Sequence, residues 1–196
     1  MSSTNAPFGL RPAFHPFGLD RAQALANGIT SAYSTNILKG QPVAYSASAG
    51  VIVPITANST QATWSGAFAG VEWTDTTGRR RVSNYWPANT AYTTGSCVAY
   101  FYNDQNIVYE IQADGSMAQT TIGGEYNFSN ITNGSTTTGL SQCTLASASA
   151  QSNGAQGQMR VVDLAQQVDN AWGDAYTVVR VQLPYVQFVA ATTAVV

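Results

Sequence analysis

The stretch GRRRVSNYWPANTAYTTGSCVAYFYNDQNIVYEIQ, residues 78–112, decides the expected fold. It contains an apolar and aromatic run at 97–102 and a second apolar run at 107–111, separated by the polar residues NDQN. Two short apolar runs around a polar turn are typical of neighbouring strands. The sequence therefore predicts a hairpin in the middle of a sheet. Just before it stand three consecutive arginines, Arg79, Arg80 and Arg81, out of eight cationic residues in the chain.

Outward from this hairpin, the chain continues as short apolar segments between turn sequences. The turn signals are SASAG, TDTTG, NDQN, ADGS, TNGS and SNGAQG. The expected strands are 42–45, 51–55, 67–73, 79–85, 97–102, 107–111, 125–131, 142–145, 158–164, 176–183 and 185–189. This spacing predicts a mainly β fold with little helix: a single antiparallel β-sandwich or barrel, jelly-roll-like.

Alternation within two segments indicates which side chains enter the core. In TVVRVQL, Thr177, Val179, Val181 and Leu183 fall on one face, and Arg180 falls on the other. In IVYEI, residues 107, 109 and 111 oppose 108 and 110, which predicts one mostly buried side. The only helical candidate, 163–172, is expected mainly as loop.

The first 28 residues differ in composition from the rest. Pro7, Pro12 and Pro16 exclude a regular helix and disfavour a central strand. The tetrapeptide PFGL occurs at 7–10 and again at 16–19. Three phenylalanines are interleaved with the prolines: Phe8, Phe14 and Phe17. The prediction is an extended N-terminal arm at 1–28 followed by a β-rich body at 29–196. The rings would bury themselves either on this body or on a neighbouring molecule.

Composition limits the classes of function. Only 9% of residues are charged, against about 25% in a typical soluble domain. A surface with so little charge is either covered by Ser, Thr, Asn, Gln and Ala or hidden against other copies and partners, and the second option is favoured because isolated proteins usually keep more charge. The net charge of −2 and pI of about 5.1 argue against nucleic-acid binding. No signal peptide or membrane-spanning segment is expected, so the protein would be made in the cytoplasm.

The residues that could carry chemistry lack partners. His15 is the only histidine and lies in the arm, and the two cysteines, Cys97 and Cys143, are far apart in the sequence. A catalytic triad and a zinc site are therefore not expected, and no phosphate-binding glycine loop is present. Buried free thiols are favoured over a disulfide. The prediction is a protein that is not an enzyme, with no catalytic residue, no cofactor and no metal.

Three readings of Arg79, Arg80 and Arg81 stay open. They can form a solvated or intramolecularly paired edge, bridge to carboxylates of a partner, or bind nucleic acid, which is the weakest reading in an acidic chain. In a regular strand Arg79 and Arg81 share a face. The predicted partner-binding residues are these arginines with Phe8, Phe14 and Phe17.

Three regions of the sequence are similar to one family of proteins. They are NAPFGLRPAFHPFGLDRA near the start, FAGVEWTDTTGRRRVSNYWPA in the middle, and QMRVVDL with VDNAWGDAYTVVRVQ near the end. Together they resemble the cement or decoration proteins of short-tailed bacteriophage heads. The resemblance implies a structural virion protein on the capsid exterior that cements neighbouring capsomers against internal DNA pressure. It transfers no catalytic residue.

The expected partners follow from this resemblance and from the composition. They are the major capsid protein and copies of the chain itself, as a homo-trimer or homo-dimer, with no nucleic acid and no membrane. The alternative is a glycan- or receptor-binding virion domain, in which tyrosine and tryptophan side chains would line a sugar site.

Overall fold

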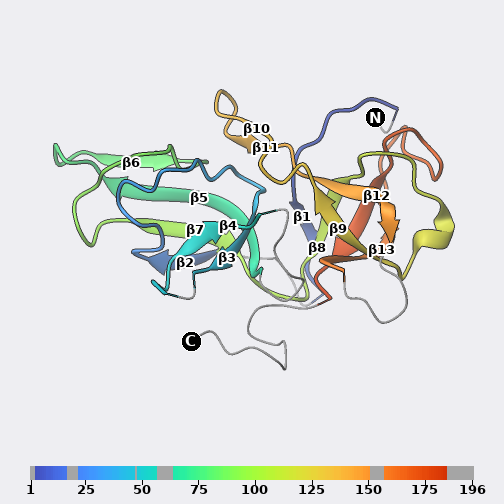
Figure 1. Ribbon diagram of the computed structural model, residues 1–196, viewed down its shortest axis with the longest axis horizontal. Coiled ribbons are helices and arrows are strands. Elements are labelled where there is room, and N and C mark those ends of the chain that lie inside the picture. The colour runs from blue at the N-terminus through green and yellow to red at the C-terminus, as the bar shows by residue number, and fades with distance from the viewer. Residues whose placement is uncertain (1–2, 17–21, 47, 57–63, 151–156, 185–196) are drawn as a thin grey trace.

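The computed structural model describes residues 3–16, 22–46, 48–56, 64–150 and 157–184. The chain is mainly β, and its antiparallel sheets pack as a sandwich, which confirms the expected fold class. Figure 1 shows two groups of strands side by side along the long axis. The expected strand at 185–189 lies outside the described residues.

Each group is a six-stranded sheet. The first sheet has the spatial order β1 (Arg11–Phe14), β8 (Val108–Gln112), β14 (Val178–Gln182), β13 (Met159–Leu164), β9 (Glu125–Ser129) and β12 (Thr144–Ala150). The second has the order β2 (Gln23–Ala26), β7 (Val98–Tyr102), β5 (Gly66–Thr74), β3 (Pro42–Tyr45) and β4 (Ile52–Pro54), with β6 (Arg80–Ser83) also paired to β5. A small hairpin of β10 (Gly134–Ser135) and β11 (Leu140–Ser141) and the short 3-10 turn Gln119–Thr121 complete the described elements.

Strands β3 and β5 of the second sheet are buried on both faces because their side chains alternate between two cores. Ala44 and Ala67 point toward the first sheet and share a core with residues such as Tyr109, Ile111 and Val181. The neighbouring side chains on β3 and β5 point the other way, into a separate core beneath the loops that carry the following residues: Ile29, Ile37, Trp86 and Cys97. The sandwich therefore has a third layer made of loops.

The expected hairpin of 97–111 is wrong. Its two runs are strands, but β7 pairs with β2 and β5 in the second sheet, while β8 pairs with β1 and β14 in the first. The NDQN turn carries the chain from one sheet to the other. Both strands are interior, and β8 is buried along its whole length. Apolar runs indicate that the strands are buried, but they do not indicate which neighbour each strand pairs with.

Several local expectations are confirmed. Thr177, Val179, Val181 and Leu183 are buried, whereas Arg180 is half-buried on the other face. After β13 ends, residues 165–177 form loop and turns. Both cysteines are free and buried, and burial raises the pKa of each thiol.

The N-terminal segment contributes edge strands to both sheets. β1 pairs with β8 at one edge of the first sheet, and β2 pairs with β7 at one edge of the second. The residues before β1 are bound to Gln112 at the end of β8. Gln112 accepts a hydrogen bond from the Ala6 amide (2.9 Å) and donates one to the Thr4 carbonyl (2.9 Å). Leu10 is 2% exposed within the shared core. Pro12 is accommodated because an edge strand leaves one side of its backbone unpaired.

Candidate interaction surfaces

The arginines lie on the hairpin of β5 and β6, near one end of the long axis (Figure 1). The strands pair in the register Glu72 with Val82, Trp73 with Arg81 and Thr74 with Arg80. The turn between them begins at Asp75 and contains Gly78 at a φ of 84°, a left-handed conformation that glycine adopts without strain. Arg79 is the last residue of the turn, and Arg80 and Arg81 are the first two of β6.

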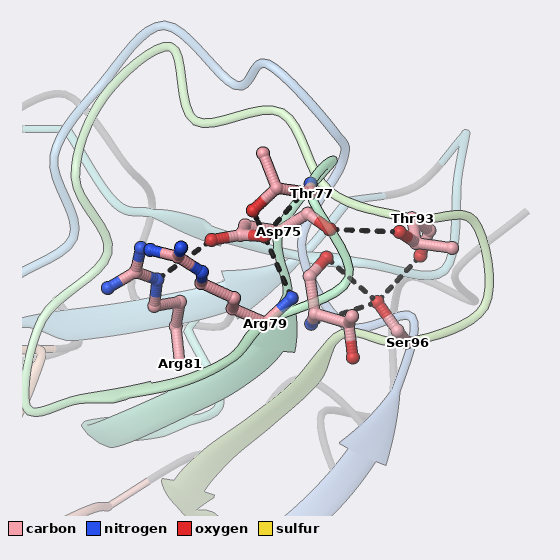
Figure 2. A network of polar contacts seen from close by, with 7 residues as sticks. Asp75, Thr77, Arg79, Arg81, Thr93 and Ser96 are labelled. Carbon is pink, nitrogen blue, oxygen red and sulfur yellow. Dashed lines mark hydrogen bonds and ion pairs between the residues drawn. The ribbon is translucent and has the colours of Figure 1, made fainter.

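The Asp75 carboxylate holds this turn together (Figure 2). Its Oδ1 accepts hydrogen bonds from the Thr77 hydroxyl (2.6 Å), the Thr77 amide (2.9 Å) and the Arg79 amide (2.9 Å). Its Oδ2 accepts one from Arg81 Nε at 2.9 Å. These bonds favour the ionised form, so they hold the pKa of Asp75 well below its usual range, with the Thr77 hydroxyl as the largest contributor.

A second set of bonds ties the turn to the chain that leads into β7. Thr93 donates its hydroxyl to the Asp75 carbonyl at 3.1 Å, and Ser96 donates its hydroxyl to the Thr93 carbonyl at 2.6 Å. The Thr74 amide in turn donates to Ser96 Oγ at 3.1 Å. Figure 2 shows these groups as one continuous network behind the turn. The backbone that carries Arg79 is therefore fixed from two sides.

Two of the three arginines are paired within the molecule. Arg80 forms an ion pair with Glu72, which lowers the pKa of Glu72 and raises that of Arg80. Arg81 pairs with Asp75. Arg79 is exposed, and none of the described residues forms an ion pair with its guanidinium. Figure 2 shows the Arg79 and Arg81 side chains on the same side of the turn. The hairpin thus presents one uncompensated guanidinium on a rigid support.

The arm residues lie elsewhere. Phe8 is half-buried, with the Arg11 guanidinium carbon 4.7 Å from its ring centroid. Phe14 is 46% exposed at the end of β1. Phe17 lies outside the described residues. Figure 1 shows β1 beside β8 at the edge of the first sheet, near the middle of the molecule, and β6 near one end, so the arm residues and the arginines belong to two separate surfaces.

A charged row on the outer face of the first sheet was not predicted from the sequence. Glu110 lies opposite Arg11 on β1 and Arg180 on β14. Its carboxylate pairs with Arg11 at 2.5 Å and with Arg180 at 3.5 Å, and the Gln167 amide donates to it at 3.2 Å. The alternation of β14 did place Arg180 outside the core, but the pairing of β1 with β8 carried no signal in the sequence. This row fastens the N-terminal segment to the sheet.

The described part of the chain was also searched for metal sites and membrane-spanning helices. There, no group of three or more His, Cys, Asp or Glu side chains is placed to hold a metal ion. No helix among the described residues is long and apolar enough to cross a membrane. No protein-family model, curated protein or solved structure significantly matches the sequence or the fold.

The Asp75 network gives a prediction about pH. A carboxyl whose folded pKa is depressed contributes stability above its unfolded pKa and loses it only as the pH falls through the folded value. We expect Asp75 to stay ionised at a pH at which an ordinary aspartate, with a pKa of about 3.9, is already protonated. An NMR titration of the carboxyl carbon measures this directly. In an Asp75→Ala variant the Thr77 and Arg79 amides should exchange with solvent faster, and unchanged exchange would contradict the role of the carboxylate.

Proposed function

We propose that this chain is a structural virion protein that binds the outside of a phage head and cements neighbouring capsomers of the major capsid protein. The observation that carries the proposal is the Arg79 guanidinium, which projects from a turn fixed by Asp75 and has no ion pair in the described part of the chain. The resemblance of the sequence to head cement proteins and the 9% charged composition point the same way.

The chemistry of the hairpin suits an acidic protein surface. A guanidinium offers a planar fork of donors that matches a carboxylate, and a prefixed backbone reduces the entropy lost on binding. Beside the arginines on the same edge strand, Val82 is 75% exposed and supplies an apolar contact. One such contact is weak, but repeated identical sites on a shell raise the effective concentration of each copy. Copies of the chain are accordingly proposed as partners as well, in a closed trimer or dimer.

The alternative of a glycan-binding domain depends on exposed aromatic side chains. Trp64, Trp73 and Trp86 are buried in the two cores, and Trp172 packs partly against the shared one. The tryptophans therefore serve packing and do not support a tryptophan-lined sugar site.

The test is attachment to expanded heads that lack this protein. We expect Arg79→Gln to lower affinity by roughly tenfold to a hundredfold, since a hydrogen bond to a charged group contributes about 1.5–3 kcal/mol. The melting temperature should not change, because this guanidinium has no ion pair among the described residues. Arg160→Gln is the matched control, because it removes a cation that pairs with Glu125 on the first sheet, 2.6 Å away. Equal occupancy by Arg79→Gln and the unmodified protein would overturn the role of the hairpin.

A further inference from the structure

A cavity of about 500 Å³ lies where the N-terminal segment meets the second sheet. Its lining includes Phe8 from the N-terminal segment and Leu140 from β11, together with Phe68 of β5, whose side chain is buried in the core of the second sheet, and its two cations are Arg11 and Lys39. Small-molecule sites usually enclose about 300–1,000 Å³, with mostly apolar walls and a few placed polar groups. In size and lining, the cavity therefore fits a ligand site.

The backbone beside the cavity is held in place on several sides. The Gly40 carbonyl accepts a hydrogen bond from the Leu10 amide (2.8 Å), and the Gly40 amide donates to the Phe68 carbonyl (2.8 Å). The Lys39 amide donates to the Gly139 carbonyl (2.9 Å), and the Lys39 carbonyl accepts from the Ser141 amide (2.9 Å). The N-terminal segment, the second sheet and the β10–β11 hairpin thus meet at Lys39, and they fix the base of its side chain.

The approach of these segments depends on glycine at position 9. Gly9 has a φ of 71°, and an added Cβ would come within 2.8 Å of the Gly40 carbonyl oxygen and 2.9 Å of Ser141 Cβ. A side chain there would push the N-terminal segment away from the loop that carries Lys39. The cavity is consequently a defined feature of the fold.

The charge of the cavity is one-sided. The Arg11 guanidinium is already shared between Glu110 and the ring of Phe8. Lys39, the only lysine of the chain, is exposed, and within the described residues it has no ion pair. No described residue that lines the cavity is acidic. A cationic group beside apolar and aromatic walls complements an anion that carries a hydrocarbon body.

We propose that this cavity binds a carboxylate carried on a compact hydrocarbon body. The carboxylate would pair with the Lys39 ammonium, and the hydrocarbon would lie against Phe8 and Leu140. The same chemistry is offered by a free aromatic or branched acid and by an acidic side chain next to a bulky apolar one in a partner's peptide. The site does not involve the arginine hairpin and does not require the proposed function.

Two probes distinguish these sources in a calorimetric titration of the full chain. The first is 3-phenylpropionate, and the second is the blocked dipeptide N-acetyl-phenylalanyl-aspartyl amide. We expect a dissociation constant on the order of 1 mM for the small acid, as is usual for a ligand of its size. Tighter binding of the dipeptide would assign the site to a peptide anchor, and preference for the free acid would assign it to a small molecule. Binding of neither probe at about ten times that concentration would overturn the proposal.

Variants and a matched probe locate the binding. Lys39→Met should weaken it at least fivefold without lowering the melting temperature, because the side chain is exposed. Arg160→Met removes a cation outside the cavity and should leave it unchanged. The cation 3-phenylpropylamine, which has the same hydrocarbon body, should not bind. Equal binding of the amine, or unchanged binding in Lys39→Met, would show that Lys39 does not recognise a carboxylate there.

Discussion

Replacing Gly66 with alanine should abolish the native fold or destabilise it by more than about 4 kcal/mol. Few single substitutions have so large an effect. A Cβ at this position would lie 1.6 Å from the Tyr102 carbonyl oxygen and 2.6 Å from its carbonyl carbon. Both obstacles are backbone atoms, which cannot rotate away as a side chain can. They belong to β7, which pairs with β5 through the middle of the second sheet. Chemical unfolding followed by tryptophan fluorescence measures the loss.

Gly78→Ala is the matched control for this experiment. Gly78 adopts a φ of 84° but has no atom within 4 Å of the position of an added Cβ. Only the conformational cost of a left-handed residue applies, about 1 kcal/mol. Similar losses for the two variants would show that the close approach of β5 and β7 is not the cause.

Removal of residues 1–14 should also abolish cooperative folding. It deletes β1, takes Leu10 from the shared core, and removes Arg11 from the Glu110 carboxylate. Loss of a large core side chain costs about 2–5 kcal/mol. The Arg11 side chain is 53% exposed, so its ion pair with Glu110 adds less, but the backbone hydrogen bonds between β1 and β8 are lost as well. These losses are large against the whole stability of an ordinary domain, about 5–15 kcal/mol.

Circular dichroism during heating tests this expectation, with a chain lacking residues 1–3 as control. That control keeps Thr4 and Ala6, the partners of Gln112. A truncated chain with an unchanged melting temperature would contradict the structural role of the segment. Poor head attachment by the longer truncation would reflect unfolding, so a contact role is better tested with Phe14→Ala. That side chain is 46% exposed and contributes less to the fold.

The fold class was predictable because local patterns alone determine it. Turn sequences mark the ends of the strands, and the alternation at 177–183 gives the buried face of β14 correctly. Which strands pair with one another was not predictable for the buried strands in the interior of the sheets. β7 and β8 are neighbours in sequence and both lie in apolar stretches, yet they belong to different sheets. The hydrophobic effect depends on the area removed from water and does not select a hydrogen-bonding partner.

The candidate surfaces show the same division. Three adjacent arginines predicted a contact region, but the sequence does not indicate which of them form ion pairs within the molecule. That depends on Glu72 and Asp75, which the register of β5 with β6 brings to Arg80 and Arg81. The cavity at Lys39 carried no signal, because its walls come from segments that are far apart in the chain. The structure explains the glycines at 9 and 40, which have left-handed φ values of 71° and 78° and lie in close contact.

The division of strands between the two sheets has a consequence for the order of events on the ribosome. All strands of the second sheet, and the core beneath its loops, come from residues 23–102, whereas the first sheet needs both β1 and β14, which ends at Gln182. The second sheet can therefore assemble while synthesis continues, and β1 must wait for its partner β8. During this interval the face with Ala44 and Ala67 remains uncovered. Contacts so distant in sequence form slowly, so this face is the point at which the nascent chain is most exposed to misassembly.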